Sequence, residues 1–561
     1  MRKSISLILS LALLFCSLPV FAFAEAEPEL KIAVASDIHY NLPEESLVWK
    51  TDDPVFGYAN RRAAMENESG FILDSFLDSC KERKVDFVLI SGDLADNGRT
   101  VPEEHYAVRD KLLNFEKETG IDVFVIDGNH DLGNNSLTGI AEFKEIYKDL
   151  GYDLALEKRE DDCSYTADLG EKYRLIALDS CDPSVSTEDG MTSEKVRWVL
   201  DQAKAAVSDG KHPVLMMHHN LLDHLPAQRI LSHNFIIRNH TATAELFANA
   251  GIKIVLTGHE HCSDAAVYTS ALGNKIFDFA TTSLTMYPLA YRELEFSDSE
   301  INYKSINIEK IDVAALSAAV SGYTDTQLEL MNKDLTAFSR QYLKKGIEYR
   351  LSLQLSAEKS GIEENSVFYP LVDSAYSHLG GLLSMPLYGE NSVSEIAAKY
   401  NIEIPETNAE NGWDLATDFV AAHFEGEESF DINGPEISAL LRTASLILRY
   451  VPGGISDDIF NGAANAIIDS IMPGDLKELC RSAFGSVTPA EYFIAALVSG
   501  LVCGFTSDSD GVPDNNGTLE GYGKTDRAQN ITDKIDSLFN KIFNLIKTFF
   551  AILLKPFMSA K

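Results

Sequence analysis

Two histidines one residue apart follow an apolar run near the middle of the chain. Residues 252–256 read Ile-Lys-Ile-Val-Leu, and Gly258, His259 and His261 come soon after them. An apolar run of this length predicts a buried strand, and alternate residues of the loop after a strand can point toward one centre. Neutral imidazole is a favoured ligand of divalent transition metals. The pair therefore indicates a metal site, although two loop histidines without a ligand would have the same spacing.

Four earlier stretches repeat this arrangement, in which a short apolar run is followed by carboxylate, amide or imidazole side chains. In open α/β sheets, sites form outside the carboxyl ends of the strands, so five such strand ends predict one shared site. The four runs are 31–36, 85–90, 123–126 and 214–217. The residues that follow them are Asp37 and His39, Gly92 and Asp93, the Gly-Asn-His-Asp sequence 128–131, and His218 and His219.

The order Asp-x-His, Gly-Asp, Gly-Asn-His-Asp, His and Gly-His-x-His resembles the signature of the calcineurin-like metallophosphoesterases, over roughly the first half of the chain. The resemblance implies an α/β fold, a two-sheet αββα sandwich, with a pair of metal ions. It implies that His130 stands near the leaving group as an acid or an electrostatic stabiliser, and Asp131 could orient it. The ligands that it implies are Asp37, His39 and His261 for the first ion, Asn129, His218 and His259 for the second, and Asp93 as the bridge between both.

The nitrogen and oxygen ligands suit two divalent transition-metal ions, with Mn, Fe, Zn or Co as the candidates, rather than Ca. Two such ions, roughly 3.5–4 Å apart, can bind a phosphoryl group and generate a hydroxide between them. We therefore expect a dimetal phosphoesterase that acts on a small phosphoester substrate. A structural metal site in a surface-interaction protein is the alternative from another class, and the complete ligand set together with His130 disfavours it.

The stretch 91–98, Ser-Gly-Asp-Leu-Ala-Asp-Asn-Gly, resembles the motif of bacterial phosphodiesterases related to the cyclic-nucleotide and glycerophosphodiester enzymes. Purple acid phosphatases carry a tyrosine three residues after the bridging aspartate, where this chain has Asp96. The resemblance thus favours a phosphodiesterase. A broad-specificity phosphomonoesterase or a nucleotidase is the alternative enzyme, although nucleotidases usually carry glutamate at the position of Asp131.

Composition and the chain ends bear on location and partners. Residues 1–24 combine Arg2 and Lys3, an apolar stretch and a small-x-small site before Glu25, which predicts a cleaved signal peptide and a secreted or cell-surface protein. The formal net charge of −37 should repel nucleic acid and anionic membranes at long range. Without metal ions, such a chain would also repel a phosphate substrate.

The seven cysteines do not form a disulfide framework. Cys16 would leave with the signal peptide, and the other six are scattered along the chain. A bridge between Cys163 and Cys181 is one interpretation, and free buried thiols are the other.

The length of 561 residues predicts more than one domain. We expect the metallophosphoesterase domain over 25–310, an all-α helical domain over 311–505, and a flexible linker rich in Asp, Gly and Asn over 506–530. Residues 531–561 carry an apolar stripe with interspersed lysines, which predicts an amphipathic helix. This helix could contact a membrane surface peripherally, self-associate, or dock on the helical domain. Outside the motif we expect His105 and His212 to lie at the surface, and His219 and His224 to hydrogen-bond within their loop.

Overall fold

The computed structural model describes residues 30–42, 63–186, 188–225, 233–297, 300–353, 369–426, 434–450 and 511–520, with a few single positions between them. The predicted signal peptide, the predicted C-terminal helix, Cys480 and Cys503 lie outside the described residues. Within the described part, no helix is long and apolar enough to span a membrane.

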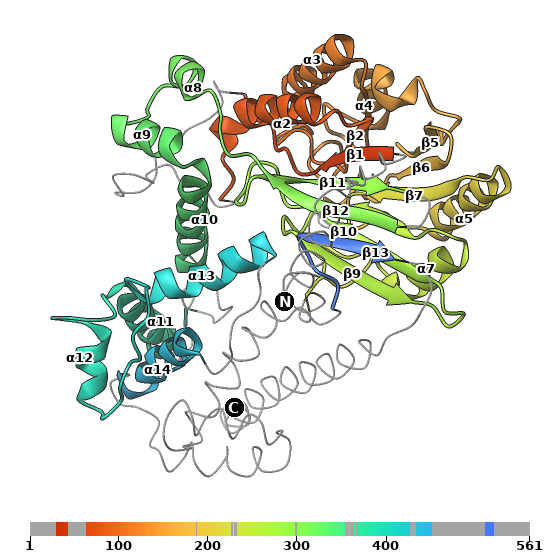
Figure 1. Ribbon diagram of the computed structural model, residues 1–561. Coiled ribbons are helices and arrows are strands. Elements are labelled where there is room, and N and C mark those ends of the chain that lie inside the picture. The colour runs from red at the N-terminus through yellow and green to blue at the C-terminus, as the bar shows by residue number, and fades with distance from the viewer. Residues whose placement is uncertain are drawn as a thin grey trace, which may run out of the picture.

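Two stacked β-sheets are formed by residues 30–307 and by a later strand, β13 (Figure 1). The first sheet has the strand order β13-β12-β11-β1-β2-β3, and the second has the order β4-β5-β6-β7-β8-β10-β9. The first sheet consists of β1 (Leu30–Ala35), β2 (Phe87–Ile90), β3 (Asp122–Val125), β11 (Ala290–Phe296), β12 (Glu300–Asn307) and β13 (Asn516–Glu520). The second consists of β4 (Glu157–Lys158), β5 (Tyr165–Leu169), β6 (Tyr173–Leu178), β7 (His212–Met217), β8 (Ile254–Thr257), β9 (Asp264–Thr269) and β10 (Lys275–Ala280).

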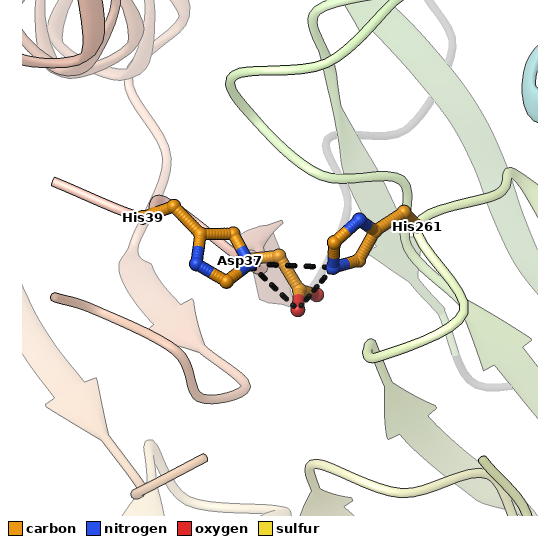
Figure 2. Close-up of side chains that lie close together, drawn as sticks. All are labelled: Asp37, His39 and His261. Carbon is orange, nitrogen blue, oxygen red and sulfur yellow. Dashed lines mark hydrogen bonds and ion pairs between the residues drawn. The ribbon is translucent and has the colours of Figure 1, made fainter. Parts of the chain in front are cut away.

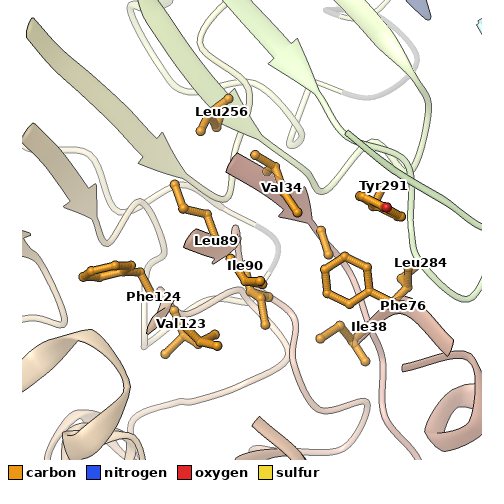
Figure 3. Packing of buried hydrophobic residues seen from close by; sticks show 14 of the residues in the cluster. Val34, Ile38, Phe76, Leu89, Ile90, Val123, Phe124, Leu256, Leu284 and Tyr291 are labelled. Carbon is orange, nitrogen blue, oxygen red and sulfur yellow. The ribbon is translucent and has the colours of Figure 1, made fainter. Parts of the chain in front are cut away.

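Helices cover the outer faces of both sheets, and their apolar sides continue the core. One cluster joins Phe76 of α2 to the strands of the first sheet and to Leu256 of the second (Figure 3). Met216, on the inner side of the second sheet, belongs to the same cluster. A second cluster joins Val199 of α5 and Phe247 of α7 to the outer side of the second sheet, including Met217. Neighbouring strand residues thus face opposite layers, which confirms the predicted αββα sandwich. The helices of this half are α2 (Ser69–Arg83), α3 (Pro102–Thr119), α4 (Ile140–Ile146), α5 (Ser193–Ser208) and α7 (His240–Asn249), with short helical turns η1 (Glu66–Glu68) and η2 (Lys148–Tyr152).

The central strands of each sheet run parallel, and this places the predicted site. β1, β2 and β3 pair in parallel in the first sheet, and β6, β7 and β8 do so in the second. Parallel strands end at the same edge of their sheet. The polar residues that follow β1, β2, β3, β7 and β8 therefore meet at one edge of the sandwich.

The part of the chain between residues 313 and 450 is mainly helical where the structure describes it, as the sequence predicts. Its helices are α8 (Val313–Ala319), α9 (Asp325–Lys333), α10 (Leu335–Ser352), α11 (Tyr369–Ser384), α12 (Val393–Ala398), α13 (Gly412–Glu425) and α14 (Pro435–Tyr450). Helices α11 to α14 share a core of their own that includes Leu387, Leu415, Phe419 and Ile437. Leu316 of α8, Met331 of α9 and Phe338 of α10 belong instead to the core of the first sheet. A further cluster joins Leu343 of α10 and Ala421 of α13 to Met286 and Tyr287 in the loop before β11. The helices therefore pack directly against the two-sheet half of the chain.

The prediction of a flexible linker over 506–530 is wrong for residues 511–520. Asn516–Glu520 form β13, which pairs antiparallel with β12 at the edge of the first sheet. The carbonyl oxygen of Asp514 accepts a 2.6 Å hydrogen bond from Nη1 of Arg292, a side chain that is 1% exposed. The segment has few apolar residues because an edge strand buries little of its surface, and only Val512 and Leu519 are buried apolar residues in it.

We predict that a chain ending at residue 510 is less stable than one ending at residue 520. The shorter chain loses β13 and the carbonyl partner of Arg292. We expect its free energy of unfolding to fall by roughly 2–5 kcal/mol, because a hydrogen bond to a charged group alone contributes about 1.5–3 kcal/mol. Urea unfolding of the two truncated chains measures the difference, and equal midpoints and slopes would contradict it.

All four cysteines of the described part that follow the signal peptide, Cys80, Cys163, Cys181 and Cys262, are buried free thiols. Of the two interpretations of Cys163 and Cys181, the structure has the unbridged one.

Candidate metal centre

The residues predicted as ligands come together where the two sheets meet. Candidate ligand atoms lie within 4.8 Å of one another in three overlapping groups. The groups are Asp37 with His39 and His261, His39 with Asp93 and His130, and Asp93 with His218 and His259.

The first group joins the end of β1 to the loop after β8 (Figure 2). Nε2 of His261 lies 3.1 Å from Oδ1 of Asp37 and 3.3 Å from Nε2 of His39. Nε2 of His39 lies 3.8 Å from the same Asp37 oxygen. Two imidazole nitrogens and one carboxylate oxygen thus converge on a single point, as ligands of one ion would.

Asp93 belongs to the second and the third group. Its Oδ2 lies 3.7 Å from Nε2 of His39 and 3.4 Å from Nε2 of His218. The carboxamide oxygen of Asn129 lies 3.0 Å from that same His218 nitrogen, and His259 completes the third group. A carboxylate between two ligand groups can give one oxygen to each of two ions, so the position of Asp93 suits a bridge.

The buried charges of the site fit a pair of divalent cations. Asp37 is fully buried, and its Oδ1 has no hydrogen-bond partner. Its Oδ2 accepts hydrogen bonds from Oγ of Ser36 at 2.6 Å and from the amide of His259 at 2.9 Å. Burial opposes a charge on His218, but Asp93 and Asp37 raise the pKa of its imidazole to about 10. A bound metal ion would displace that proton, and the imidazole, carboxylate and amide donors are those that Mn, Fe, Zn and Co accept.

Five of the seven predicted ligands have left-handed backbones. The φ angles are 50° for Asp37, 44° for His39, 50° for Asp93, 67° for His259 and 64° for His261. A residue other than glycine in this region carries roughly 1–3 kcal/mol of strain, and such residues cluster at functional sites. The strand ends are therefore curled to aim side chains inward, at a cost that the rest of the fold offsets.

Two glycines of the sequence motifs allow the loops to approach each other. A Cβ atom on Gly128 would lie 2.1 Å from Oδ1 of Asp93, and one on Gly258 would lie 1.8 Å from Oγ of Ser36. Any side chain at either position would displace a ligand or its hydrogen-bond partner.

Residues 30–263 match the family model described as calcineurin-like phosphoesterase. The match spans all seven predicted ligands and His130. This part of the chain belongs to the calcineurin-like phosphoesterase superfamily. The phosphoesterase domain is accordingly that of a metal-dependent phosphoester hydrolase.

Three solved structures resemble the chain over about half its length. A dimetal phosphatase from Danio rerio is 12% identical, with 50% of this chain and 97% of its own covered and a TM-score of 0.38. A predicted phosphoesterase from Streptococcus pneumoniae TIGR4 is 14% identical, with 51% and 92% covered and a TM-score of 0.23. The anchor protein of the Plasmodium inner membrane complex is 13% identical, with 53% and 98% covered and a TM-score of 0.30. With TM-scores this low, the assignment to the superfamily depends on the family model and the site.

Two predicted histidine ligands, His218 and His39, contact an oxygen atom on the side of the ring that faces away from the metal centre. Nδ1 of His218 lies 3.0 Å from the carbonyl oxygen of Ser91, which can only accept, so Nδ1 carries the proton and Nε2 is left for an ion. Oδ1 of Asp96 lies 3.2 Å from Nδ1 of His39, so its carboxylate contacts the nitrogen of that ring that does not face the other donors. Such partners orient metal-bound histidines and raise their basicity. In the sequence, Asp96 serves only to set aside one enzyme class, because its contact with His39 depends on the fold.

We predict that Asp96→Ala weakens binding of the ion held by His39. The imidazole would lose its orienting carboxylate, and loss of such a partner typically lowers metal affinity by about 10–100-fold. Titration of the metal-free protein with Mn²⁺ or Zn²⁺ measures the change. Asp201→Ala, at an exposed position of α5, is the matched control, and equal affinities for the two variants would contradict the role.

His130 lies beside the centre, with its ring edge-on to that of His39 at a centroid distance of 4.8 Å. Its main-chain amide donates a 2.8 Å hydrogen bond to Oδ1 of Asp93. Nδ1 of its ring lies 2.9 Å from the carbonyl oxygen of Asp96, which can only accept, so Nδ1 carries a proton and proton transfer would involve Nε2.

The geometry is against the predicted catalytic role of Asp131 as the group that orients His130. Its buried carboxylate accepts hydrogen bonds from the main-chain amides of Leu94, Ala95 and Gly128, at 3.2, 3.0 and 2.8 Å. The carbonyl oxygen of Asp96 takes the orienting position instead. Asp131 therefore ties the loop after β2 to the loop after β3, and so acts as a positioning residue.

Three other histidines near the metal centre, His105, His219 and His224, have structural contacts. His105, expected at the surface, is fully buried, and its ring contacts Tyr147 Oη at 2.9 Å and the carbonyl oxygen of Asp131 at 2.8 Å. His224 contacts Asp264 at 2.6 Å, and Nδ1 of His219 lies 3.0 Å from Oγ of Ser180. Both contacts are structural, as expected, but they reach residues of other segments instead of the loop itself. The prediction that His105 lies at the surface is wrong.

Met286, in the loop before β11, lies between the helical part and the metal centre. Its Sδ lies 2.9 Å from Nδ1 of the predicted ligand His261. Met286 packs in the cluster formed with Leu343 and Ala421 of the helical part. Nearby, the carbonyl oxygen of Phe424 accepts a 3.1 Å hydrogen bond from the amide of Ser263, two residues after His261. The helices thus support the loop that carries the last ligands.

Proposed function

We propose that this protein is a secreted dimetal phosphodiesterase. The observation that carries the hydrolytic part of the proposal is the convergence of the seven predicted ligands, with Asp93 between His39 and His218 and with His130 beside them. A structural metal site is normally closed by its ligands and gives no reason for a further imidazole, that of His130, beside the seven donors.

The residues of the chain have separable tasks in such a reaction. Two divalent ions, when bound, neutralise the phosphoryl oxygens and make a water acidic enough to serve as the nucleophile near neutral pH. Asp37, His39 and His261 would hold one ion, Asn129, His218 and His259 the other, and Asp93 both. His130 in its protonated form would donate the Nε2 proton to the leaving oxygen, while Nδ1 keeps its hydrogen bond to the Asp96 carbonyl oxygen.

The diester preference is supported by the stretch 91–98 and its resemblance to bacterial phosphodiesterases. Asp96, where purple acid phosphatases have a tyrosine, contacts the imidazole of His39. In this chain the position therefore serves ligand orientation. The leaving groups of candidate substrates, a cyclic nucleotide or a glycerophosphodiester, would need the proton that His130 can give.

The test compares two chromogenic substrates on the full chain after reconstitution with Mn²⁺. Faster turnover of bis-p-nitrophenyl phosphate than of p-nitrophenyl phosphate is the expected result. The reverse order would replace the diesterase by the alternative, a phosphomonoesterase or nucleotidase. If the protein binds both ions but hydrolyses neither substrate, the result would favour the structural metal site of an interaction protein.

Export and membrane contact are proposals that depend on residues outside the described part. Residues 1–24 would be removed, so N-terminal sequencing of the exported protein should begin at Glu25, and an intact Met1 would contradict secretion. The helix over 531–561 would tether the enzyme weakly to a membrane face or to a second copy. Liposome flotation of the full protein beside a chain ending at Arg527 tests this, and two soluble monomers would leave docking on the helical part.

A further inference from the structure

A second polar cluster lies beside the metal centre, at the end of β3 in the first sheet and at the end of β6, the neighbour of β7, in the second. The centre takes ligands from the ends of β1, β2 and β3 in the first sheet and of β7 and β8 in the second. The outer cluster joins Asp127, just after β3, to Asp179 and Cys181, just after β6. One carboxylate oxygen of each aspartate and the Sγ of Cys181 all lie within 4.8 Å of one another, and all three residues are buried.

Asp127 is the unexplained member of this cluster. Its side chain is 0% exposed, and neither Oδ1 nor Oδ2 has a hydrogen-bond partner. A buried carboxylate without a partner is expensive, and buried charges in proteins are normally paired or coordinate a metal ion. Its own main-chain carbonyl is 3.9 Å from the thiol of Cys181, so the residue is closely surrounded by the other members.

The neighbouring cation does not satisfy Asp127. Nζ of Lys195 donates to the carbonyl oxygen of Asp179 at 2.7 Å and to its Oδ1 at 3.2 Å. The carboxylate of Asp179 also accepts from the amides of Cys163 and Cys181, at 3.2 and 2.9 Å. Asp179 is thus paired and positioned, whereas Asp127 faces it across the cluster without a hydrogen bond of its own.

We propose that Asp127, Asp179 and Cys181 form a third metal site, separate from the dimetal pair, that takes a divalent ion of the Zn²⁺ or Co²⁺ type. Thiolate sulfur selects such ions over Ca²⁺ and Mg²⁺, and the two carboxylates supply oxygen ligands that they also accept. On binding, the Cys181 thiol releases its proton to solvent, and the sulfur forms the bond to the metal. The ion would pair the charge on Asp127.

Such an ion would affect the rigidity of the loops around the metal centre. The site would link the end of β3 in the first sheet to the end of β6 in the second. Asp127 precedes the predicted ligand Asn129 by two residues, and Nδ1 of His219 lies 4.0 Å from the Cys181 sulfur. A third ion would therefore stiffen the loop that carries Asn129 and His130, without a place in the reaction itself.

Cobalt substitution of the full chain provides the test, because the dimetal pair has only nitrogen and oxygen ligands. We expect the Co²⁺-loaded protein to show a thiolate-to-cobalt charge-transfer band and three ions per chain. Cys181→Ser should remove the band and one ion. Cys163→Ser is the matched control, since Cys163 is a buried free thiol whose amide contacts the same Asp179 carboxylate, and it should keep both.

A second pair of variants keeps the proposal testable if Cys181→Ser folds poorly. Asp127→Asn preserves shape and removes the charge, so it should bind two ions and melt at least as high as the unsubstituted chain when both are metal-free. Asp162→Asn is its control, because Asp162 is also buried but pairs with Arg159 at 2.6 Å, and it should bind three ions. Two ions in the unsubstituted chain, no charge-transfer band, or a band that survives in Cys181→Ser would each overturn the third site.

Discussion

Asp93→Ala is expected to abolish phosphoester hydrolysis and to empty the metal centre. Oδ2 of Asp93 lies within 3.7 Å of the imidazoles of both His39 and His218, so its loss removes the group that the two ions would share. Its Oδ1 also accepts the amide of His130 at 2.8 Å, which means that the same substitution releases the candidate acid. Metal content and turnover of bis-p-nitrophenyl phosphate, measured on one preparation, check the result.

The control for this variant is Asp74→Ala. Asp74 is an exposed carboxylate of α2 in an ion pair with Lys111, and such surface pairs contribute about 0–1 kcal/mol to stability. It should keep both ions and full activity. An Asp93→Ala protein that retains two tightly bound ions and normal turnover would show that Asp93 is not the bridge.

The ligand residues could be predicted from the sequence because each follows a strand with a strong apolar signal. Asp37, Asp93 and His218 directly follow or nearly follow buried runs, and parallel strands bring their ends to one edge. The resemblance then added their order. Local pattern and tertiary arrangement agree here, so the structure brings together all seven residues assigned as ligands.

The supporting residues could not be predicted, because their roles depend on how the backbone turns after each strand. Asp96 reaches His39 only because the loop after Asp93 runs alongside the loop after Asp37, with main-chain hydrogen bonds such as that from the amide of His39 to the carbonyl oxygen of Asp93. Asp131 turns toward the main chain for the same reason. Neither contact leaves a periodic signal in the sequence.

β13 and His105 show two further limits of the sequence pattern. A polar strand at the edge of a sheet is recognised by its partner strand rather than by its composition, and β12 lies more than 200 residues earlier. His105 is buried because Tyr147 and the Asp131 carbonyl oxygen satisfy its ring nitrogens. Composition predicts exposure for both, and tertiary hydrogen bonds override it.

The helical part changes how a truncation must be interpreted. All seven predicted ligands precede residue 312, yet Met286 beside His261 packs against Leu343 and Ala421. β13 then returns from beyond the helices to the first sheet. Deleting everything after residue 312 would therefore remove both an edge strand and the helices that pack against Met286. Single substitutions separate the contribution of the strand from that of the helices better.

His130→Ala is expected to keep both ions and to slow turnover by roughly 10²–10⁴-fold, the usual contribution of a positioned acid or base. The ring is held by its Nδ1 contact with the Asp96 carbonyl oxygen, which leaves Nε2 as the nitrogen that can give a proton to the leaving oxygen. The loss should be smaller for bis-p-nitrophenyl phosphate than for diphenyl phosphate, because p-nitrophenolate is the better leaving group and needs the proton less.

His212→Ala is the matched control, since His212 is an exposed imidazole at the opposite end of β7. It should leave both rates and the metal content unchanged. An equal loss on the two diesters would remove the acid role of His130 and leave electrostatic stabilisation. Loss of an ion from His130→Ala would instead make His130 a ligand, which its place in one group with His39 and Asp93 would allow. The leaving-group series and the metal count together therefore separate the three roles that an imidazole in this position can have.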